Sequence, residues 1–325
     1  MAPPSPAIDL PIAVVGEALI DLVVPADGAI RAATGGAPFN VARACARLGA
    51  PVSLVAAIST DRFGQCLMAN LNADGVHTEQ VQRVERPTTL AVAELDAVGA
   101  ATYRFYVEGT SAAALATAPL PVTTRAVVAG GLGLAVEPMA NAVERIVLDA
   151  SDDVLVLLDL NCRPGAVADR DRYLARLRRV LARADVVKAS IEDLHYTDPT
   201  TAPTVVAAGL VAGHARTVLL TAGAAATTVV TATDRRAVPV TDSPVLDTIG
   251  AGDSFTAGFL TWWMASGRAV DDLADVETVV AAVEAAHQVA AVVVGRRGAD
   301  PPHRGELRPG WGPVTGWAGD RGSRR

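Results

Sequence analysis

The stretch with the most chemical potential is DTIGAGDSFTAGFL, residues 247–260. Two glycines flank a small residue in Gly250, Ala251 and Gly252, so the backbone can approach a ligand closely. A glycine-rich turn that opens a helix presents free backbone N–H groups and a positive dipole end to an anion such as a phosphate. Asp253 falls in the first helical turn, where a carboxylate is either a helix cap or a base that accepts the proton of an attacking hydroxyl.

A dinucleotide-binding site is the competing interpretation of this stretch. GAGDSF matches only half of the G-x-G-x-x-G fingerprint, because Phe255 stands in place of the third glycine. The match also lies far from the first strand-helix turn of the chain, where that fingerprint usually occurs. We therefore disfavour a nicotinamide enzyme.

A second polar set is expected at the ends of the predicted strands and in the first helix. Ligands of doubly wound sheets bind outside the carboxyl ends of the strands, and carboxylate, amide and guanidinium groups form directional hydrogen bonds with a polyhydroxylated molecule. In TGGAPFN, a tight turn followed by a helix cap is an alternative explanation for Gly35, Gly36 and Asn40. The set consists of Asp21, Asn40, Asn161 and Arg163, and Gly35 and Gly36 form the turn before the first helix.

The elements that must position these residues alternate between strands and helices. Apolar runs predict strands within residues 12–24, 52–59, 125–134, 154–161, 186–190 and 217–223. Helical patterns lie between them; Val41, Ala44, Cys45 and Leu48 form one apolar stripe, and Phe63, Leu67 and Leu71 form another. Strands separated by helices indicate βαβ units. The predicted fold is α/β, with a doubly wound, mostly parallel sheet flanked by helices.

Residues 87–110 break the alternation with two extended runs around a turn at Asp96–Gly99. Such a hairpin has no place in a parallel sheet, so we expect it to project as a small antiparallel lid. Tyr103 and Phe105 alternate onto one face of it. With only 5 Phe, 4 Trp and 4 Tyr in the chain, this aromatic cluster suits either the core or the apolar face of a sugar ring.

Composition excludes several classes of protein. The 28 Lys and Arg against 35 Asp and Glu give a net charge of −7, which argues against a nucleic-acid binder. The mean hydropathy is +0.31, but Glu284, His287 and Gln288 interrupt the apolar run near the end. We therefore expect no membrane span and a cytoplasmic protein. Three cysteines are too few for a disulfide framework, and the single lysine, Lys188, lies in neither a Walker A loop nor a protein-kinase motif.

The chain resembles the PfkB (ribokinase-like) carbohydrate kinases. GGAPFNVARACARLGAPVSLVAAISTDRFG and DTIGAGDSFTAGFL are similar to the two signatures of that family, and the similarity covers about residues 12–302. GEALIDL, YRFYVEGTS, DLNCRP, VKASIEDL and RRGADPP resemble its bacterial fructokinase branch. The resemblance implies one ribokinase-like domain over residues 1–325, with a lid formed by about 22–34 and 87–110 and an irregular tail over 303–325.

The resemblance also implies roles for particular residues. Asp253 would be the catalytic base, and Gly250, Ala251 and Gly252 would form the anion hole. The sugar-binding residues would be Asp21, Gly35, Gly36, Asn40, Phe105, Asn161 and Arg163, and the nucleotide-binding residues Lys188, Thr221, Gly223 and His287. Glu192 or Asp193 would be linked to Mg²⁺.

The predicted activity is transfer of the γ-phosphate of ATP to a primary hydroxyl of a ketohexose, with fructose as the leading candidate. The alternatives are a 2-keto-3-deoxygluconate kinase, a ribokinase or nucleoside kinase, and a sugar-binding relative without turnover. Ala226 replaces a glycine usual in the family and is the reason to keep the last alternative. A requirement for K⁺ stays open, as does a homodimer formed through a lid face that bears Val92, Leu95 and Tyr103.

Overall fold

A nine-stranded sheet forms the centre of the chain in the computed structural model, which describes residues 9, 11–26, 28–96 and 101–312. The strand order is β13-β12-β11-β10-β9-β8-β1-β4-β5. All neighbouring strands pair in parallel except β11 with β12 and β12 with β13. The strands are β1 (Ile12–Val15), β4 (Val52–Ser59), β5 (Val81–Val84), β8 (Ala126–Gly130), β9 (Leu155–Asp159), β10 (Val186–Ser190), β11 (Thr217–Thr221), β12 (Thr227–Thr231) and β13 (Arg235–Val238). The predicted mostly parallel sheet is confirmed.

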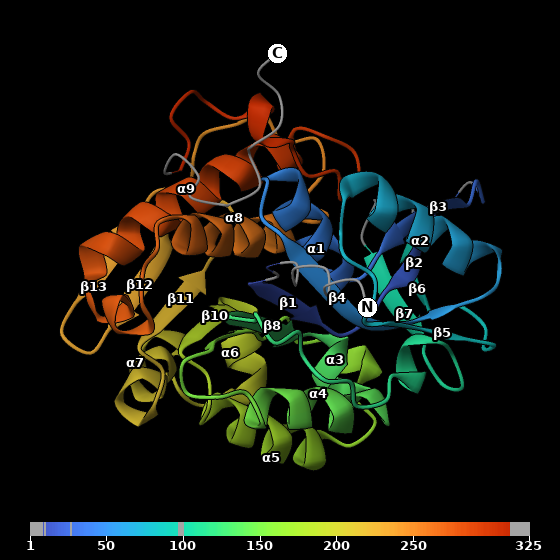
Figure 1. Cartoon of the computed structure of the whole chain (residues 1–325), viewed down its shortest axis with the longest axis horizontal. Coiled ribbons are helices and arrows are strands. Elements are labelled where there is room, and N and C mark those ends of the chain that lie inside the picture. The colour runs from blue at the N-terminus through green and yellow to red at the C-terminus, as the bar shows by residue number, and fades with distance from the viewer. Residues whose placement is uncertain (1–8, 10, 27, 97–100, 313–325) are drawn as a thin grey trace, which may run out of the picture.

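Helices cover both faces of this sheet (Figure 1). Strands β1, β4, β8 and β9 are buried along their whole length, because helices pack on either side of their apolar side chains. One layer contains α1 (Ala37–Arg47), α2 (Arg62–Asp74), α8 (Ala251–Ala265) and α9 (Val276–Val294). The other contains α3 (Leu132–Ala135), α4 (Met139–Leu148), α5 (Arg170–Leu181), α6 (Ile191–Thr197) and α7 (Pro203–Gly213). Short 3₁₀ turns span Ala112–Ala114, Pro164–Ala166, Val270–Ala274 and Arg304–Glu306.

The apolar stripes of the first two helices meet the core to different extents. All four predicted positions of the α1 stripe are buried. In α2, Leu67 and Leu71 are buried, but Phe63 is 41% exposed. Phe63 lies in the first turn, directly after the Asp61 cap, where the helix starts at the surface. The predicted stripe therefore meets the core only at Leu67 and Leu71.

A separate four-stranded sheet forms the lid, in the order β3-β2-β6-β7. Its strands are β2 (Leu19–Val24), β3 (Arg31–Gly35), β6 (Leu90–Leu95) and β7 (Ala101–Tyr106), so the lid begins at Leu19 rather than at residue 22. The outer pairs are antiparallel, as expected, whereas β2 and β6 are parallel. These two strands follow β1 and β5, which themselves point the same way in the large sheet. Part of the predicted turn at Asp96–Gly99 lies outside the described residues.

The register of the lid separates its two faces. Ala91 pairs with Phe105 and Ala93 with Tyr103, so these four side chains share one face. Val92 pairs with Arg104 on the opposite face and is only 8% exposed. The predicted dimer surface combined Val92 with Tyr103, and the register shows that these residues cannot lie on one surface.

Helix α9 is long and apolar enough to cross a membrane by length and composition, contrary to the expectation that its polar residues would prevent this. Half of the apolar window is buried within the chain, and α9 packs along α8. Its apolar character is therefore explained by its place in the core. Beyond α9, Trp311 is buried and its indole N–H donates to the carbonyl of Ala285; Trp317 lies outside the described residues.

Candidate active site

The turn before α8 is held in a backbone conformation that requires glycine. Gly250 caps the helix with φ of 78°. A Cβ at this position would lie 2.6 Å from the Cβ of Ala299, so a side chain is excluded by space as well as by conformation. Ala251 and Gly252 follow in the first turn of α8. The N–H of Ala251 donates to the carbonyl of Thr248 at 3.2 Å, and the N–H groups that follow it face the open end of the helix. This is the geometry of an anion site.

Asp253 extends from the same turn towards α1. Its Oδ2 accepts a 2.8 Å hydrogen bond from Nδ2 of Asn40. Desolvation raises the pKa of Asp253 to about 6, with the Asn40 hydrogen bond opposing this and the Asp159 carboxylate adding to it. The carboxylate is therefore mostly ionised at pH 7 and able to accept a proton.

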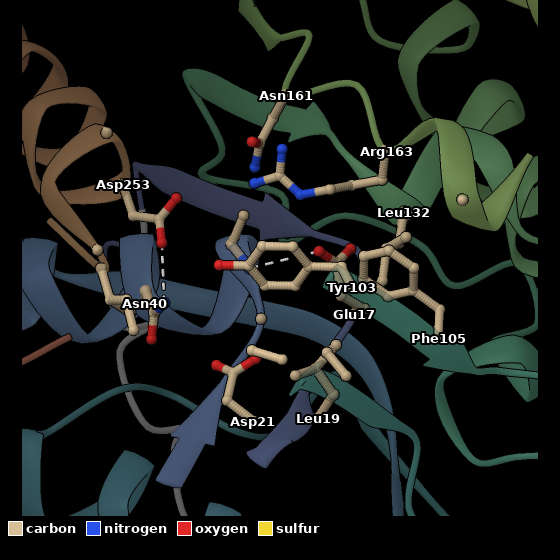
Figure 2. A pocket seen from close by; sticks show the side chains of 18 of the residues that line it. Glu17, Leu19, Asp21, Asn40, Tyr103, Phe105, Leu132, Asn161, Arg163 and Asp253 are labelled. Atoms are coloured by element: carbon tan, nitrogen blue, oxygen red, sulfur yellow. Dashed lines mark hydrogen bonds between the residues drawn. The ribbon is translucent and has the colours of Figure 1, made fainter. Parts of the chain in front are cut away.

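Asp253 borders a cavity of about 550 Å³, the size of a small-molecule site. Figure 2 shows Asn161 and Arg163 extending into the same space as Asp253, with the lid aromatics in front. The predicted residues that line the cavity are Asp21, Gly36, Asn40, Phe105, Asn161, Arg163, Gly250, Gly252 and Asp253. The structure thus brings together, around one cavity, segments that the sequence analysis singled out.

Asp21 faces the cavity from β2, and Gly35 makes room for it. A Cβ on Gly35 would lie 1.9 Å from Oδ2 of Asp21, so any side chain there would displace the carboxylate. Gly35 itself does not line the cavity and acts from behind Asp21. Desolvation raises the pKa of Asp21 to about 6; the nearby Asp253 carboxylate also raises it, and Arg163 opposes.

Glu17 also lines the cavity and was missed from the sequence. It is 2% exposed; Oε1 accepts from the N–H of Ala37, and Oε2 accepts from the N–H of Gly133. Despite these bonds, burial raises the pKa of Glu17 to about 8. The signal was present in GEALIDL, where an acid follows a buried strand within an apolar run. Glu17 ties the start of α1 to the start of α3 at the cavity wall.

The lid contributes a second aromatic ring beside Phe105. Tyr103 and Phe105 stack with ring centroids 6.4 Å apart and planes inclined by 14°. Both line the cavity, and Tyr103 is 55% exposed. Their rings provide the apolar surface on this side, while the opposite wall is polar (Figure 2). An apolar face opposite hydrogen-bonding groups is suited to a sugar ring.

Asn161 lies in the loop after β9, in a backbone conformation rare for a residue with a side chain. Its φ is 39°, and among the described non-glycine residues it alone has positive φ. Such strain persists where surrounding contacts fix it, and it concentrates at functional sites. This placement agrees with the predicted contact between the loop and a ligand.

The residues predicted for the nucleotide are less uniformly placed. Thr221 and Gly223 lie at the carboxyl end of β11, beside the end of β10, and Gly223 is exposed. His287 is 3% exposed, and its Nε2 shares a 2.9 Å hydrogen bond with Oγ1 of Thr227. The predicted contact of His287 with a nucleotide does not fit this burial. The residue supports the start of β12, directly after Ala226.

Lys188 is buried rather than open to a groove. It is 7% exposed, and its Nζ lies 2.6 Å from Oδ2 of Asp159. The ammonium group lies beside the anion-site turn, Gly250–Gly252, because a Cβ on Gly252 would be 3.4 Å from Nζ. The contact of Lys188 with a nucleotide therefore stays a prediction.

Of the two metal candidates, only Glu192 has a free carboxylate. Oδ1 of Asp193 accepts from the N–H of Cys162, and Oδ2 accepts from the N–H of Ser190 as part of a capping box. Asp193 therefore fits a structural role rather than a metal ligand. Glu192 is exposed in the first turn of α6. Within the described residues no cluster of three or more His, Cys, Asp or Glu is suited to a metal ion.

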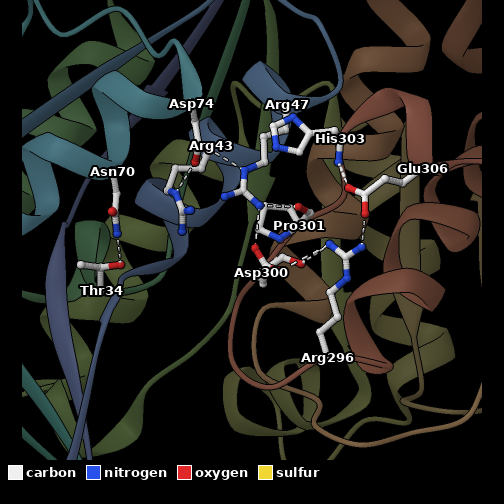
Figure 3. Close-up of polar contacts among 10 residues, drawn as sticks. All are labelled: Thr34, Arg43, Arg47, Asn70, Asp74, Arg296, Asp300, Pro301, His303 and Glu306. Atoms are coloured by element: carbon white, nitrogen blue, oxygen red, sulfur yellow. Dashed lines mark hydrogen bonds and ion pairs between the residues drawn. The ribbon is translucent and has the colours of Figure 1, made fainter.

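The segment after α9 supports the anion-site turn through Ala299 and is itself held by ion pairs (Figure 3). Arg47 of α1 donates to Asp300 at 2.6 Å, to the carbonyl of Pro301 at 2.7 Å and to Asp74 of α2 at 2.7 Å. Arg296 bonds to Asp300 from the other side. This network fixes the RRGADPP segment, residues 296–302, against α1 of the first family signature, while Ala299 of the segment lies against Gly250 of the second.

Comparison with known proteins identifies the family. Residues 10–304 match the family model described as "pfkB family carbohydrate kinase". The chain belongs to the pfkB family. Among its curated relatives, a fructokinase of Rhizobium leguminosarum bv. trifolii is 35% identical, with 75% of this chain and 77% of the relative covered. A fructokinase of Salmonella typhimurium is 31% identical, with 79% and 86% covered.

Solved structures of pfkB relatives agree with the fold. A fructokinase of Xylella fastidiosa with bound ATP superposes with a TM-score of 0.82 at 30% identity, covering 89% of this chain and 93% of that one. This pfkB protein is therefore a sugar kinase, a phosphotransferase with an alcohol acceptor. The anion site, the carboxylate and the cavity are arranged as that chemistry needs.

Proposed function

We propose that this pfkB kinase transfers the γ-phosphate of ATP to a primary hydroxyl of fructose. The observation that carries the proposal is the position of Asp253, which joins the N-terminus of α8 to a cavity of sugar size. The relatives named fructokinase support the substrate, and the ATP-bound Xylella fastidiosa relative supports the phosphate donor.

In this mechanism Asp253 accepts the proton of the attacking hydroxyl. The hydroxyl oxygen forms a bond to the γ-phosphorus as the bond to the leaving ADP oxygen breaks, so that a phosphosugar and ADP result. N–H groups at the start of α8 stabilise the charge on the phosphoryl oxygens. Phosphoryl transfer depends mainly on positioning, which suits a site built from backbone and one carboxylate. The lid aromatics exclude water, which would otherwise hydrolyse ATP.

The charges around the cavity favour a neutral sugar over a sugar acid. Asp21 and Asp253 are mostly ionised above pH 6, whereas Arg163 is the one cation among the described lining residues. A substrate carboxylate would have to approach two carboxylates to reach that single guanidinium. The alternative substrate, 2-keto-3-deoxygluconate, is therefore disfavoured relative to fructose.

Mg²⁺ would enter with ATP, since this ion binds through one or two carboxylates together with phosphate oxygens. Glu192 is the residue that would approach it, and Mg²⁺ supplies charge compensation for the phosphates when bound. We place the enzyme in the cytoplasm, in keeping with its free cysteines, and expect neither nucleic-acid nor membrane partners. Dimerisation through the lid stays a prediction, which light scattering tests. A K⁺ requirement also stays a prediction, which assays with K⁺ replaced by Na⁺ test.

A coupled ADP-release assay tests the function. Purified protein with ATP and Mg²⁺ is assayed with fructose, 2-keto-3-deoxygluconate, ribose and adenosine, and Asp253→Asn is the control. We expect fructose to give the highest kcat/KM, at or above about 10⁴ M⁻¹s⁻¹. A higher value with another acceptor would overturn the substrate, and no turnover with any acceptor would overturn the activity.

A further inference from the structure

A buried ion pair lies beside the anion-site turn, and the mechanism above does not use it. Nζ of Lys188 on β10 contacts Oδ2 of Asp159 at the end of β9, at 2.6 Å. The same Oδ2 is 2.9 Å from Oγ1 of Thr256 on α8, which donates to it. Lys188 and Asp159 are 7% and 6% exposed. The pair therefore links the central sheet to the first turns of α8.

The place of this pair suggests a role beyond stability. Two charges lose hydration on burial, and a well-packed apolar pair is often as stable or more stable. Here the ammonium lies 3.4 Å from the position that a Cβ on Gly252 would occupy. Gly252 is the last residue of the anion-site turn and directly precedes Asp253. Thr256 follows Gly252 by one helical turn. A displacement of Lys188 or Asp159 would therefore change the surroundings of both Asp253 and the anion-site turn.

We propose that Lys188 and Asp159 are positioning residues of phosphoryl transfer, whose opposite charges balance each other at Asp253 and hold the start of α8 through Thr256. The inference rests on the proposed function for Asp253 as the base. Lys188 favours the ionised carboxylate, and Asp159 disfavours it. Because the two charges oppose each other, loss of either one changes the base, whereas loss of both restores the balance.

Other groups also act on Asp253 and stay unchanged in the test. Asn40 donates to it from α1, and Arg163 stabilises its negative charge from the loop after β9. The Asp21 carboxylate on β2 repels it once both groups are ionised, and the carboxyl group of Glu17, in the loop after β1, adds to this repulsion only when it loses its proton at higher pH. Among the described residues, the charged or titratable groups that interact with Asp253 include Glu17, Asp21, Asp159, Arg163 and Lys188.

The test compares Lys188→Met, Asp159→Asn and the double variant by the pH dependence of kcat/KM. Wild-type activity should rise through about pH 6, as Asp253 and Asp21 lose their protons, and the variants should displace the part that belongs to Asp253. Lys188→Met should move this limb to higher pH and Asp159→Asn to lower pH, each by about 0.5 to 1 unit. The double variant should return to within about 0.3 unit of wild type if the charges compensate. A purely structural role predicts no such opposition.

Two further variants serve as controls. Arg183→Met breaks a partly buried ion pair, with Asp185 at 3.2 Å near the start of β10, and should leave the limb in place. Thr256→Val removes the hydrogen bond to Asp159 without changing charge, so it should lower kcat with little shift of the limb. Equal shifts in both single variants, no shift in either, or a double variant that stays displaced would overturn the inference.

A readout without turnover separates this inference from the proposed function. Protein labelled with ¹³C at the aspartate carboxyls is titrated by NMR, and the signal of Asp253 is the one that disappears in Asp253→Asn. The same opposite shifts are expected in its titration midpoint. If the wild type phosphorylates no sugar, the proposed function fails, and this titration still decides whether Lys188 and Asp159 balance the charge at Asp253. If one single variant does not fold, the other single variant and the double variant are compared with the wild type. The double variant leaves neither charge unpaired, and its midpoint should still return to that of the wild type.

Discussion

Nδ2 of Asn40 donates a 2.8 Å hydrogen bond to Oδ2 of Asp253, joining the first turns of α1 and α8 at the cavity. The other side-chain atom of Asn40, Oδ1, is buried without a hydrogen-bond partner. A buried acceptor left unpaired costs about 1 to 3 kcal/mol, which a substrate hydroxyl donating to it would offset. One amide therefore both orients the base and offers an acceptor to the ligand.

Asn40→Ala should reduce kcat/KM by about 10- to 100-fold, because hydrogen bonds to charged groups contribute about 1.5 to 3 kcal/mol. The hydrogen bond lowers the pKa of Asp253, so its loss should also move the acid limb of the pH profile upwards. Steady-state kinetics between pH 5 and 8 would measure both effects. Asn70→Ala removes a bond of the same length, to Thr34 of the lid (Figure 3), and should leave this limb in place. Equal changes in the two variants would contradict the role of Asn40.

Asp253→Asn should lower kcat by about 10²- to 10⁴-fold, the contribution of a general base, while fructose still binds. The amide keeps the shape of the side chain but cannot accept the proton. Calorimetric titration of the variant with fructose, beside the ADP-release assay, separates binding from turnover. Lost binding with normal turnover at saturating sugar would be incompatible with a base at this position.

Gly35→Ala should raise KM for the sugar by at least about 10-fold, with a smaller effect on kcat, because the new Cβ would displace the Asp21 carboxylate. Gly209→Ala is a matched control in α7, where an added Cβ meets nothing within 4 Å. That change should preserve kinetics and stabilise the protein by about 0.5 to 1 kcal/mol, as alanine favours helix over glycine. An unchanged KM in Gly35→Ala would show that Asp21 does not hold the substrate.

Glu17→Gln should flatten the dependence of stability on pH. The pKa of Glu17 is raised to about 8 in the folded protein, so the folded state binds more protons than the unfolded state between about pH 4.5 and 8. Its contribution therefore makes the free energy of unfolding fall as pH rises through that window, by at most about 1.4 kcal/mol per unit. The variant lacks this decline, although it also loses one backbone hydrogen bond at every pH. Urea unfolding at pH 5, 6, 7 and 8 measures the two slopes, and equal slopes would contradict the assignment.

Local patterns in the sequence were sufficient for much of the fold and the site. The buried runs of β4 and β9 and the helical stripe of α1 depend mainly on neighbours in sequence, and each element forms as predicted. The glycine at position 250 likewise follows from a local requirement, since the turn before α8 needs a positive φ there. Since parallel strands end at one edge of the sheet, Asn161 and Arg163 could be placed at the site before the structure was known. Asp21 reaches the same cavity from β2 of the lid, not from the end of a strand of the large sheet.

Contacts between distant segments could not be predicted in the same way. The burial of His287 depends on Thr227 of β12, and that of Lys188 depends on Asp159 of β9. Nothing near Asp193 in sequence shows that the N–H of Cys162 would occupy its carboxylate. These pairings follow from how the elements pack, which residue type and spacing do not encode by themselves.

The parallel pairing of β2 with β6 has a consequence for how the protein folds. It joins Ile20 to Leu90. The chain between these two residues forms β3, α1, β4, α2 and β5, so the pairing closes a long loop. Closing so long a loop loses entropy before any contact compensates, so the lid should assemble after that part of the large sheet. The same order in reverse allows the lid to open by local unfolding while the sheet persists, and its amide hydrogens should exchange faster than those of β1 and β8.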